Sequence, residues 1–168
     1  MGGTMKLSSI SDDFFELVKF DKELMDNTNR RPYLIILRLK YSGIRQDFAV
    51  PFRSNIDSNT PKDQYFSLPP RKTTQKHHVH GLHYLKMFPI KSEYLRKFNV
   101  ENNPYYATLL GIINKNLKTI VKDAQKYLDD YQNGRKQRYC TNIDGIYLAM
   151  NQILEVKDVA PAKENNNG

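Results

Sequence analysis

A β-hairpin pattern runs through Tyr33-Leu34-Ile35-Ile36-Leu37-Arg38-Leu39-Lys40-Tyr41-Ser42-Gly43-Ile44-Arg45-Gln46-Asp47-Phe48-Ala49-Val50. The first half, which follows Pro32, is rich in Leu and Ile, and Ser42-Gly43 is a plausible two-residue turn. We expect the return strand to run from about 44 to 50. A hairpin of this kind builds an antiparallel sheet, which favours an α+β fold over a parallel α/β fold.

Pro51 follows the return strand directly and cannot donate a hydrogen bond to a sheet ladder. We therefore expect the strand to end there and Phe52-Arg53-Ser54-Asn55 to emerge onto a loop. Loops at the ends of rigid strands often carry binding and catalytic side chains. The sequence thus marks Arg53 and Ser54 as candidate site residues.

Other short elements surround the hairpin. We expect a strand over 6–10, then a helix that begins at Ser11 as N-cap and extends towards Met25. Prolines make the region after residue 60 irregular, and a further strand is predicted over 82–90. A short helix is predicted over 92–98.

A long helix is predicted from Pro104 to about Asn133, with Asn103 as N-cap and Gly134 as its end. Its apolar stripe at helical spacing consists of Tyr106, Ile113, Leu117, Ile120, Ala124 and Tyr131. The opposite face carries Lys115, Lys118, Lys122 and Lys126. These lysines are read first as a solvated face, and second as a stripe that tracks phosphates. A last helix is expected over 144–154.

The charge of the chain favours an acidic partner. Lys and Arg number 26 against 18 Asp and Glu, which gives a net charge of +8. Acids are scarce between Arg30 and Ser92, where Asp47, Asp57 and Asp63 are the only ones, and the span from Gln64 to Ser92 has none. Nucleic acid is the polyanion that such a surface suits best.

The four histidines are clustered within seven positions, at His77, His78, His80 and His83. They are read as surface histidines, as groups for nucleic-acid binding or acid–base chemistry, or as metal ligands. No Cys or carboxylate lies near them in sequence, and their spacing matches no ligand motif that we can justify. We therefore assign no metal site.

Several classes of protein are excluded or disfavoured. The single cysteine, Cys140, rules out an internal disulfide and a cysteine-based zinc site. No apolar run approaches the roughly 20 residues that span a membrane, and the N-terminus has no signal-peptide hydrophobic region. We expect a cytoplasmic protein without membrane association, with one domain over 6–156 and flexible ends at 1–5 and 157–168.

Arg53, Ser54, Lys86 and Tyr33 could together perform RNA transesterification. That reaction needs a base for the ribose 2′-hydroxyl, donors for the pentavalent phosphate and an acid for the leaving 5′ oxygen. It needs no cofactor, because the nucleophile belongs to the substrate. A serine hydroxyl, an arginine and a lysine are suitable phosphate donors. Taken alone, Ser54 is more simply an ordinary loop serine.

Three blocks of the chain occur in a characteristic order. They are Arg31-Pro32-Tyr33-Leu34-Ile35-Ile36-Leu37, Phe48-Ala49-Val50-Pro51-Phe52-Arg53-Ser54-Asn55-Ile56 and Gly81-Leu82-His83-Tyr84-Leu85-Lys86. Together they resemble the ToxN/AbiQ family, the endoribonuclease toxins of type III toxin–antitoxin systems, and among them its CptN-like branch. With a helical C-terminal half, they extend the resemblance over most of residues 6 to 155.

The resemblance implies a compact, twisted, β-barrel-like antiparallel sheet related to MazF/Kid toxins, with flanking helices. It implies a metal-independent endoribonuclease that leaves 2′,3′-cyclic phosphate and 5′-hydroxyl ends. Its partner would be a repetitive antitoxin RNA that the toxin cuts into pseudoknot units, and toxin and RNA would form a cyclic hetero-oligomer. Cellular or phage RNA would be the substrate.

The resemblance also assigns residues. Ser54 matches the family's active-site serine, Tyr33 an aromatic on the preceding strand, and Lys86 the lysine of the Gly-Leu-x-x-x-Lys block. Some members carry Thr-Ser followed two positions later by Lys, where this chain has Arg53-Ser54 and Ile56, so Arg53 or Lys86 is expected to supply that cation. The expected RNA-binding residues are Arg31, Arg71, Lys72, Lys76, His77, His78, His80, His83 and Tyr84.

Two other classes of function compete with this reading. A non-catalytic RNA-binding module could use the same basic face, and loss of cleavage without loss of binding in Ser54→Ala would separate the two. A DNA-binding regulator is disfavoured, because no convincing helix-turn-helix or basic recognition helix is present.

Overall fold

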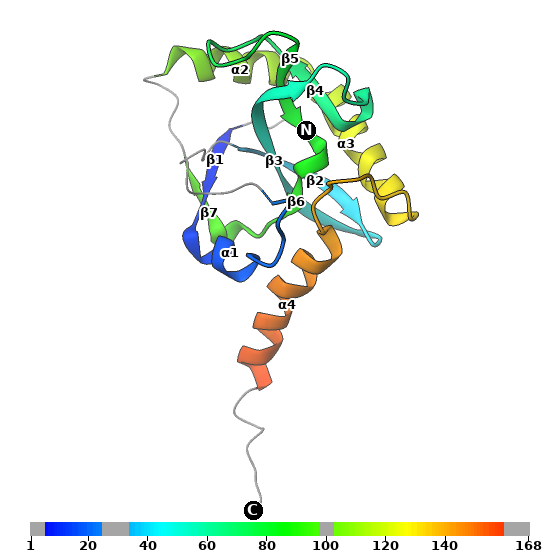
Figure 1. The fold of residues 1–168 in the computed structure, drawn as a ribbon. Coiled ribbons are helices and arrows are strands. Elements are labelled where there is room, and N and C mark those ends of the chain that lie inside the picture. Colours follow the sequence, from blue (N-terminus) through cyan, green and yellow to red (C-terminus); the bar gives the residue numbers. More distant parts are fainter. Residues whose placement is uncertain (1–5, 25–33, 98–102, 160–168) are drawn as a thin grey trace, which may run out of the picture.

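The computed structural model describes residues 6–24, 34–97 and 103–159 of the chain, with side chains as far as residue 152. In these residues a seven-stranded antiparallel sheet is flanked by helices (Figure 1). The strand order is β4-β5-β3-β2-β1-β7, and β6 pairs with β3 beside this path. The predicted α+β class is confirmed. The sheet is open rather than a closed barrel, because β4 and β7 lie at opposite ends of this order.

The hairpin is formed by β2 (Leu34–Tyr41) and β3 (Ile44–Asp57), with Tyr41 opposite Ile44. Ser42 and Gly43 have φ values of 51° and 81°. Two consecutive left-handed residues are what a two-residue type I′ turn requires, and its twist matches that of the strands. The turn predicted at this position is confirmed.

The prediction that the return strand ends at Pro51 is wrong. Pro51 lies opposite Leu34, at the end of the ladder with β2, but β3 continues to Asp57. Beyond Pro51 the strand pairs on with β5 (His78–His83), through Phe52 opposite Leu82. The missing N–H therefore ends one ladder and not the strand.

The remaining strands are short. They are β1 (Leu7–Ile10), which confirms the predicted first strand, β4 (Tyr65–Leu68), β6 (Phe88–Pro89) and β7 (Leu95–Lys97). Three 3₁₀ turns punctuate them: η1 (Lys62–Gln64), η2 (Tyr84–Lys86) and η3 (Ser92–Tyr94). The strand predicted over 82–90 is thus interrupted by η2, and the helix predicted from residue 92 is a single turn that leads into β7.

The first helix, α1 (Asp12–Leu17), begins after Ser11 as predicted but ends well before Met25, which lies outside the described residues. The Asp21 carboxylate accepts a hydrogen bond of 2.9 Å from the backbone N–H of Glu23. An aspartate that bonds the backbone two residues on favours a turn over a helix. A turn over residues 21–23 therefore stands where we expected the helix to continue.

The helix predicted from Pro104 to Asn133 is divided at Asn116 into α2 (Pro104–Lys115) and α3 (Leu117–Gln132). Asn103 is the N-cap as predicted, and its side chain accepts from the N–H of Tyr106. The Asn116 side chain donates to the carbonyl of Ile112 at 2.8 Å, and this competition with the backbone ladder favours a break. In Figure 1, α2 lies near β4 and β5, and α3 runs in a different direction beside the sheet.

Both faces of the sheet are covered. Alternate side chains of β2, namely Ile35, Leu37 and Leu39, pack in one core with residues of α2 and α3. A second core is built by α1, β6 and α4 (Ile143–Val159), where the rings of Phe14 and Phe88 stack at 5.4 Å. Burial of each such ring contributes on the order of 2–3 kcal/mol. The predicted last helix is confirmed.

None of the helices in the described part of the chain is both long and apolar enough to cross a bilayer.

A cationic cavity as the candidate active site

A cavity of about 540 Å³ opens where β3, β5 and η2 meet the loop that follows α3. The segment after α1 closes another side of it through Glu23. Its lining includes cationic, imidazole and aromatic groups from separate parts of the chain, among them Arg53, His78, His83, Lys86, Arg138 and Tyr139. The fold thus gathers residues that lie as much as 116 positions apart in sequence, from Glu23 to Tyr139.

The cavity wall on β3 is a β-bulge. The pairing of β3 with β5 shifts register between Arg53 and Ile56, so the residues between them depart from the regular ladder. Arg53 is exposed and lines the cavity. Asn55 also lines it, and its side chain donates to Thr73 O at 3.2 Å and accepts from Gln75 N at 2.7 Å. The bulge therefore anchors the loop between β4 and β5 at the cavity rim.

Ser54 lies in this bulge, within a strand and not on the loop that we predicted. It is only 8% exposed, and it does not belong to the described lining of the cavity although both of its neighbours do. Arg53 therefore lines the cavity directly, whereas Ser54 is buried next to the cavity wall.

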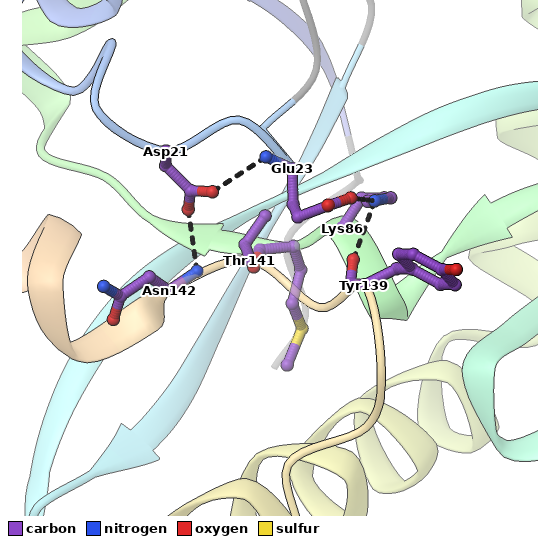
Figure 2. A network of polar contacts seen from close by, with 7 residues as sticks. Asp21, Glu23, Lys86, Tyr139, Thr141 and Asn142 are labelled. Carbon is purple, nitrogen blue, oxygen red and sulfur yellow. Dashed lines mark hydrogen bonds and ion pairs between the residues drawn. The ribbon is translucent and has the colours of Figure 1, made fainter.

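Lys86 is the most constrained cation of the cavity. Its Nζ donates to Glu23 Oε1 and to the carbonyl of Tyr139, each at 2.7 Å, and its side chain is 11% exposed. Figure 2 shows how the surrounding chain is tied together: Asp21 bonds the N–H of both Glu23 and Asn142. The predicted lysine thus lies where the segment after α1 meets the loop after α3.

His83 is a neutral imidazole in a cationic setting. It is 5% exposed, and its Nδ1 has no hydrogen-bond partner among the described residues. Burial lowers the pKa of His83 to about 3, with further contributions from the charges of Arg53 and Lys86. At neutral pH this side chain is therefore uncharged and adds no positive charge to those of Arg53, Lys86 and Arg138.

The other histidines do not join His83 in one cluster. His78 lines the cavity, and its Nδ1 lies 2.9 Å from Lys76 O. His77 is exposed. His80 is 1% exposed, with Nδ1 2.9 Å from Pro69 O, and burial lowers its pKa. Among the residues that the structure describes, no three His, Cys, Asp or Glu side chains group as metal ligands do.

Two residues predicted to contact RNA are interior. Tyr84 is fully buried in the main core, because η2 turns its ring inward just after β5 ends. His80 is buried between Phe52 and Tyr105, whose rings stack on it. Neither is available on the surface, which corrects the prediction that they bind RNA.

The other predicted RNA-binding residues of the β4–β5 loop remain accessible. Lys72 and Lys76 are exposed, and the Arg71 guanidinium lies over the ring of Tyr105 at 5.0 Å. Asn55, which lines the cavity, bonds to Thr73 and Gln75 of this loop, so the loop that carries these cations is tied to the cavity rim. Arg31 and Tyr33 lie outside the described residues.

The charges of the cavity suit a single anion. Arg53, Lys86 and Arg138 face two carboxylates of the lining, Glu23 and Asp57, which leaves one net positive charge. A phosphodiester carries one negative charge and accepts several hydrogen bonds, so arginine and lysine can hold it. The neutral His83 beside them adds an imidazole without adding charge.

Sequence reasoning missed most of the other lining residues, among them the polar and aromatic side chains of Glu23, Asn55, Arg138 and Tyr139. Asn55 belongs to the second of the three sequence blocks, from Phe48 to Ile56. Arg138 ends a basic run that begins at Arg135, and such a run indicates an exposed cationic turn. Glu23 offers no such signal, because only the fold brings it to Lys86.

The fold and the cavity together define an α+β protein with an open antiparallel sheet and a cationic, imidazole-containing cavity. Three solved structures share this fold. One, from work on a bacterial antiviral system regulated by a processed non-coding RNA, has a TM-score of 0.64 and 18% identity, covering 85% of this chain and 95% of that one. A second, from work on bacterial type III toxin–antitoxin systems with selective toxin inhibition by an RNA pseudoknot, has a TM-score of 0.66 and 16% identity, covering 91% and 99%.

The third is AbiQ, a lactococcal anti-phage endoribonuclease of the type III toxin–antitoxin system, with a TM-score of 0.60 and 13% identity, covering 96% of this chain and 100% of that one. No family model and no curated protein sequence matches the chain. The chain therefore has the fold of the ToxN/AbiQ toxins, and the resemblance seen in three sequence blocks is confirmed at the level of the fold.

Proposed function

We propose that this chain is a metal-independent endoribonuclease toxin of a type III toxin–antitoxin system. It cleaves RNA to 2′,3′-cyclic phosphate and 5′-hydroxyl ends, and a repetitive pseudoknot-forming RNA, which it processes, inhibits it. The support is twofold. The fold is shared with a type III toxin–antitoxin protein studied for its inhibition by an RNA pseudoknot and with an anti-phage endoribonuclease, and the predicted site residues Arg53 and Lys86 lie on one cavity. A single domain over 6–156, acting in the cytoplasm in phage defence, belongs to this proposal.

The observation that carries the proposal is the juxtaposition of Arg53, Lys86 and a neutral His83 on one cavity. Cleavage by the 2′-oxygen forms a P–O2′ bond and breaks the P–O5′ bond. The phosphate gains charge in the transition state, so fixed cations beside it stabilise that state more than the ground state. In this proposal the side chains of the protein supply that stabilisation.

Proton transfer is the second requirement. The 2′-hydroxyl must lose a proton, and the leaving 5′ oxygen must gain one. Burial lowers the pKa of His83 most, and the charges of Arg53 and Lys86 lower it further. A bound phosphate would offset these two charges, so the imidazole would be a better base in the complex than in the free protein. We assign this proton transfer to His83 or to Tyr33, and a donor role at the bulge to Ser54.

The proposed partner is the antitoxin RNA, held on the surface that runs from the cavity to the loop with Arg71, Lys72 and Lys76. Toxin and RNA units would close into a cyclic hetero-oligomer. The substrates would be cellular or phage RNA.

The test is cleavage of RNA by purified protein in excess chelator, followed by mapping of both termini. We expect undiminished cleavage with cyclic phosphate and 5′-hydroxyl ends. A 5′-phosphate product, or activity lost on chelation and restored by a divalent ion, would overturn the mechanism. Binding of RNA without any cleavage, unchanged in Ser54→Ala, would support the non-catalytic RNA-binding module instead.

A further inference from the structure

Tyr139 is an exposed aromatic residue at a charged cavity. Its side chain is 57% exposed, yet it belongs to the lining of the cavity together with Arg53 and Lys86. The guanidinium of Arg138 lies 4.9 Å from the centre of its ring. An exposed ring lacks the stabilisation that burial would provide, so packing does not explain an aromatic side chain on a cavity with Arg53, Lys86 and Arg138.

The backbone holds this ring in place. Tyr139 has φ +68°, a left-handed conformation that bulky side chains rarely adopt. It costs free energy and persists only where the surrounding structure imposes it. Lys86 Nζ donates to its carbonyl at 2.7 Å, and the next residues are bonded back through Cys140 N to Gln137 O at 3.2 Å and Thr141 N to Leu85 O at 3.3 Å. The cation of the cavity thus fixes the backbone of the exposed aromatic residue (Figure 2).

We propose that Tyr139 is a stacking platform for an unpaired nucleobase next to the phosphate that the cavity binds. This inference rests on the proposed function and names the substrate form that the same site selects. A flat, exposed ring on a fixed backbone loses less conformational entropy when a base stacks on it than a ring on a mobile loop would. Arg138 stiffens the ring and offers a second flat surface.

The proposal has a consequence for substrate choice. A base in a duplex is already stacked and paired, so it must be pulled out before it can lie on Tyr139. The site would therefore favour single-stranded positions, and it would tolerate different bases because every base has a flat face. The cations would hold the phosphate, and the ring would fix which nucleotide lies beside it.

The first arm of the test uses three variants of the full chain. Tyr139→Asn removes the ring but keeps a residue that tolerates the left-handed backbone, and Tyr139→Phe keeps the ring. Leu148→Ser is the control, because Leu148 is an apolar side chain on α4 with a similar exposed fraction of 55%. We expect KM for a single-stranded RNA to rise roughly 10- to 100-fold in Tyr139→Asn with kcat little changed, and to stay near wild type in the other two.

The second arm identifies the group that the ring contacts. Once the cleaved bond is mapped, oligonucleotides with an abasic position on either side of it are compared with the intact RNA. With wild-type protein one abasic substrate should lose about the same factor as Tyr139→Asn loses on intact RNA, and the two changes together should lose little more. Losses that simply multiply, or an unchanged KM in Tyr139→Asn, would overturn the platform.

Failure of the proposed function is distinguishable from failure of this inference. If wild-type protein binds the RNA but does not cleave it, the endoribonuclease proposal fails, and the same oligonucleotides are compared by their dissociation constants. Loss of affinity that is not additive between Tyr139→Asn and the abasic position still supports the platform. Independent losses, or none, overturn it in that case too.

Discussion

The ammonium of Lys86 lies 2.7 Å from the carboxylate of Glu23, inside the cavity that we assign to RNA cleavage. The lysine side chain is 11% exposed and that of the glutamate 40% exposed. Glu23 therefore bonds the cation from the more open side, and a phosphate that uses Lys86 must share it with this carboxylate or displace it.

Neutralising Glu23 should strengthen RNA binding. In Glu23→Gln the carboxylate no longer repels a phosphate or competes for Lys86, so the dissociation constant should fall several-fold at low ionic strength, and less at high salt. Titration of a labelled single-stranded RNA measures this. Glu16→Gln is the control, because Glu16, which lies on α1, forms an exposed ion pair with Lys19. Weaker binding in Glu23→Gln would show instead that Glu23 positions the lysine.

Removal of either proposed phosphate donor should abolish toxicity. We expect Ser54→Ala and Lys86→Ala each to reduce the cleavage rate by on the order of 100-fold or more, since each removes a donor to developing charge. The measurement is the growth of cells that express wild type or each variant at matched levels. Circular dichroism of the purified variants checks that each is folded. Ser92→Ala, at an exposed serine in η3, should stay toxic. If both site variants remain fully toxic, the residues are misassigned.

Local patterns predicted the fold where the chain obeys local physics. Ser42-Gly43 places two residues in the left-handed region, and the hairpin register follows from that turn. The prediction at Pro51 was wrong because a proline ends pairing only with the strand on one side. The strand continues by pairing with β5, which lies some 30 residues further along the chain and could not be foreseen from the local sequence. At Asn116 one side chain divides a pattern that is helical on both sides.

The candidate site was only partly visible in the sequence. Arg53, Lys86 and His83 belong to predicted blocks and meet at one cavity, but their partners Glu23 and Tyr139 come from distant segments. The burial of individual residues in this run was harder to predict than the position of the run itself. His80 and Tyr84 belong to the same histidine-rich run as His83, yet they pack inside, because strand and turn geometry decides which side chains face the cavity.

The buried imidazole of His83 should make the fold sensitive to acid. Burial, with the nearby charges of Arg53 and Lys86, lowers its pKa to about 3, whereas an unfolded histidine titrates near 6.5. Between these values the unfolded chain binds a proton that the folded chain does not, so stability falls as pH drops from about 6.5 towards 3. In His83→Asn, the loss of unfolding free energy between pH 7 and 4.5 should be smaller by about 1–3 kcal/mol.

Urea denaturation of both proteins at the two pH values measures this difference. The comparison is made within each protein, so any packing lost in the variant cancels. An equal loss of stability in wild type and His83→Asn would contradict the assignment of a buried neutral imidazole.

Gly81 should not tolerate a side chain. A Cβ at this position would lie 2.4 Å from the carbonyl oxygen of Phe66, so β4 would have to move away from β5. We expect Gly81→Ala to cost about 1–3 kcal/mol, or roughly 2–12 °C in Tm, and to disturb Arg53, which lies opposite in the ladder. Gly111→Ala is the matched control, because its Cβ would meet open space on α2. Calorimetry should show no loss in that control, and equal stability of the two variants would contradict the close approach.

The affinity for RNA should depend on salt through the cations of the loop between β4 and β5. Asn55 holds the loop that carries Lys72 and Lys76, so phosphates of a bound RNA can run from the cavity along these exposed cations. Each neutralised phosphate releases counterions, and affinity should fall log-linearly with salt concentration. Reversing both charges to Glu should flatten that slope by roughly one to two units.

The matched comparison reverses Lys118 and Lys122, which are exposed on α3. This pair should flatten the slope only if α3 also contacts the RNA, so the two double variants map the extent of the surface. The RNA to use is the tandem repeat that the proposed function expects upstream of the gene, against a scrambled RNA of equal length. Because unpaired bases supply sequence preference, the repeat should bind more tightly at every salt concentration. Equal binding of repeat and scrambled RNA across the titration would remove the antitoxin RNA from the proposal, since charge alone would then account for the affinity.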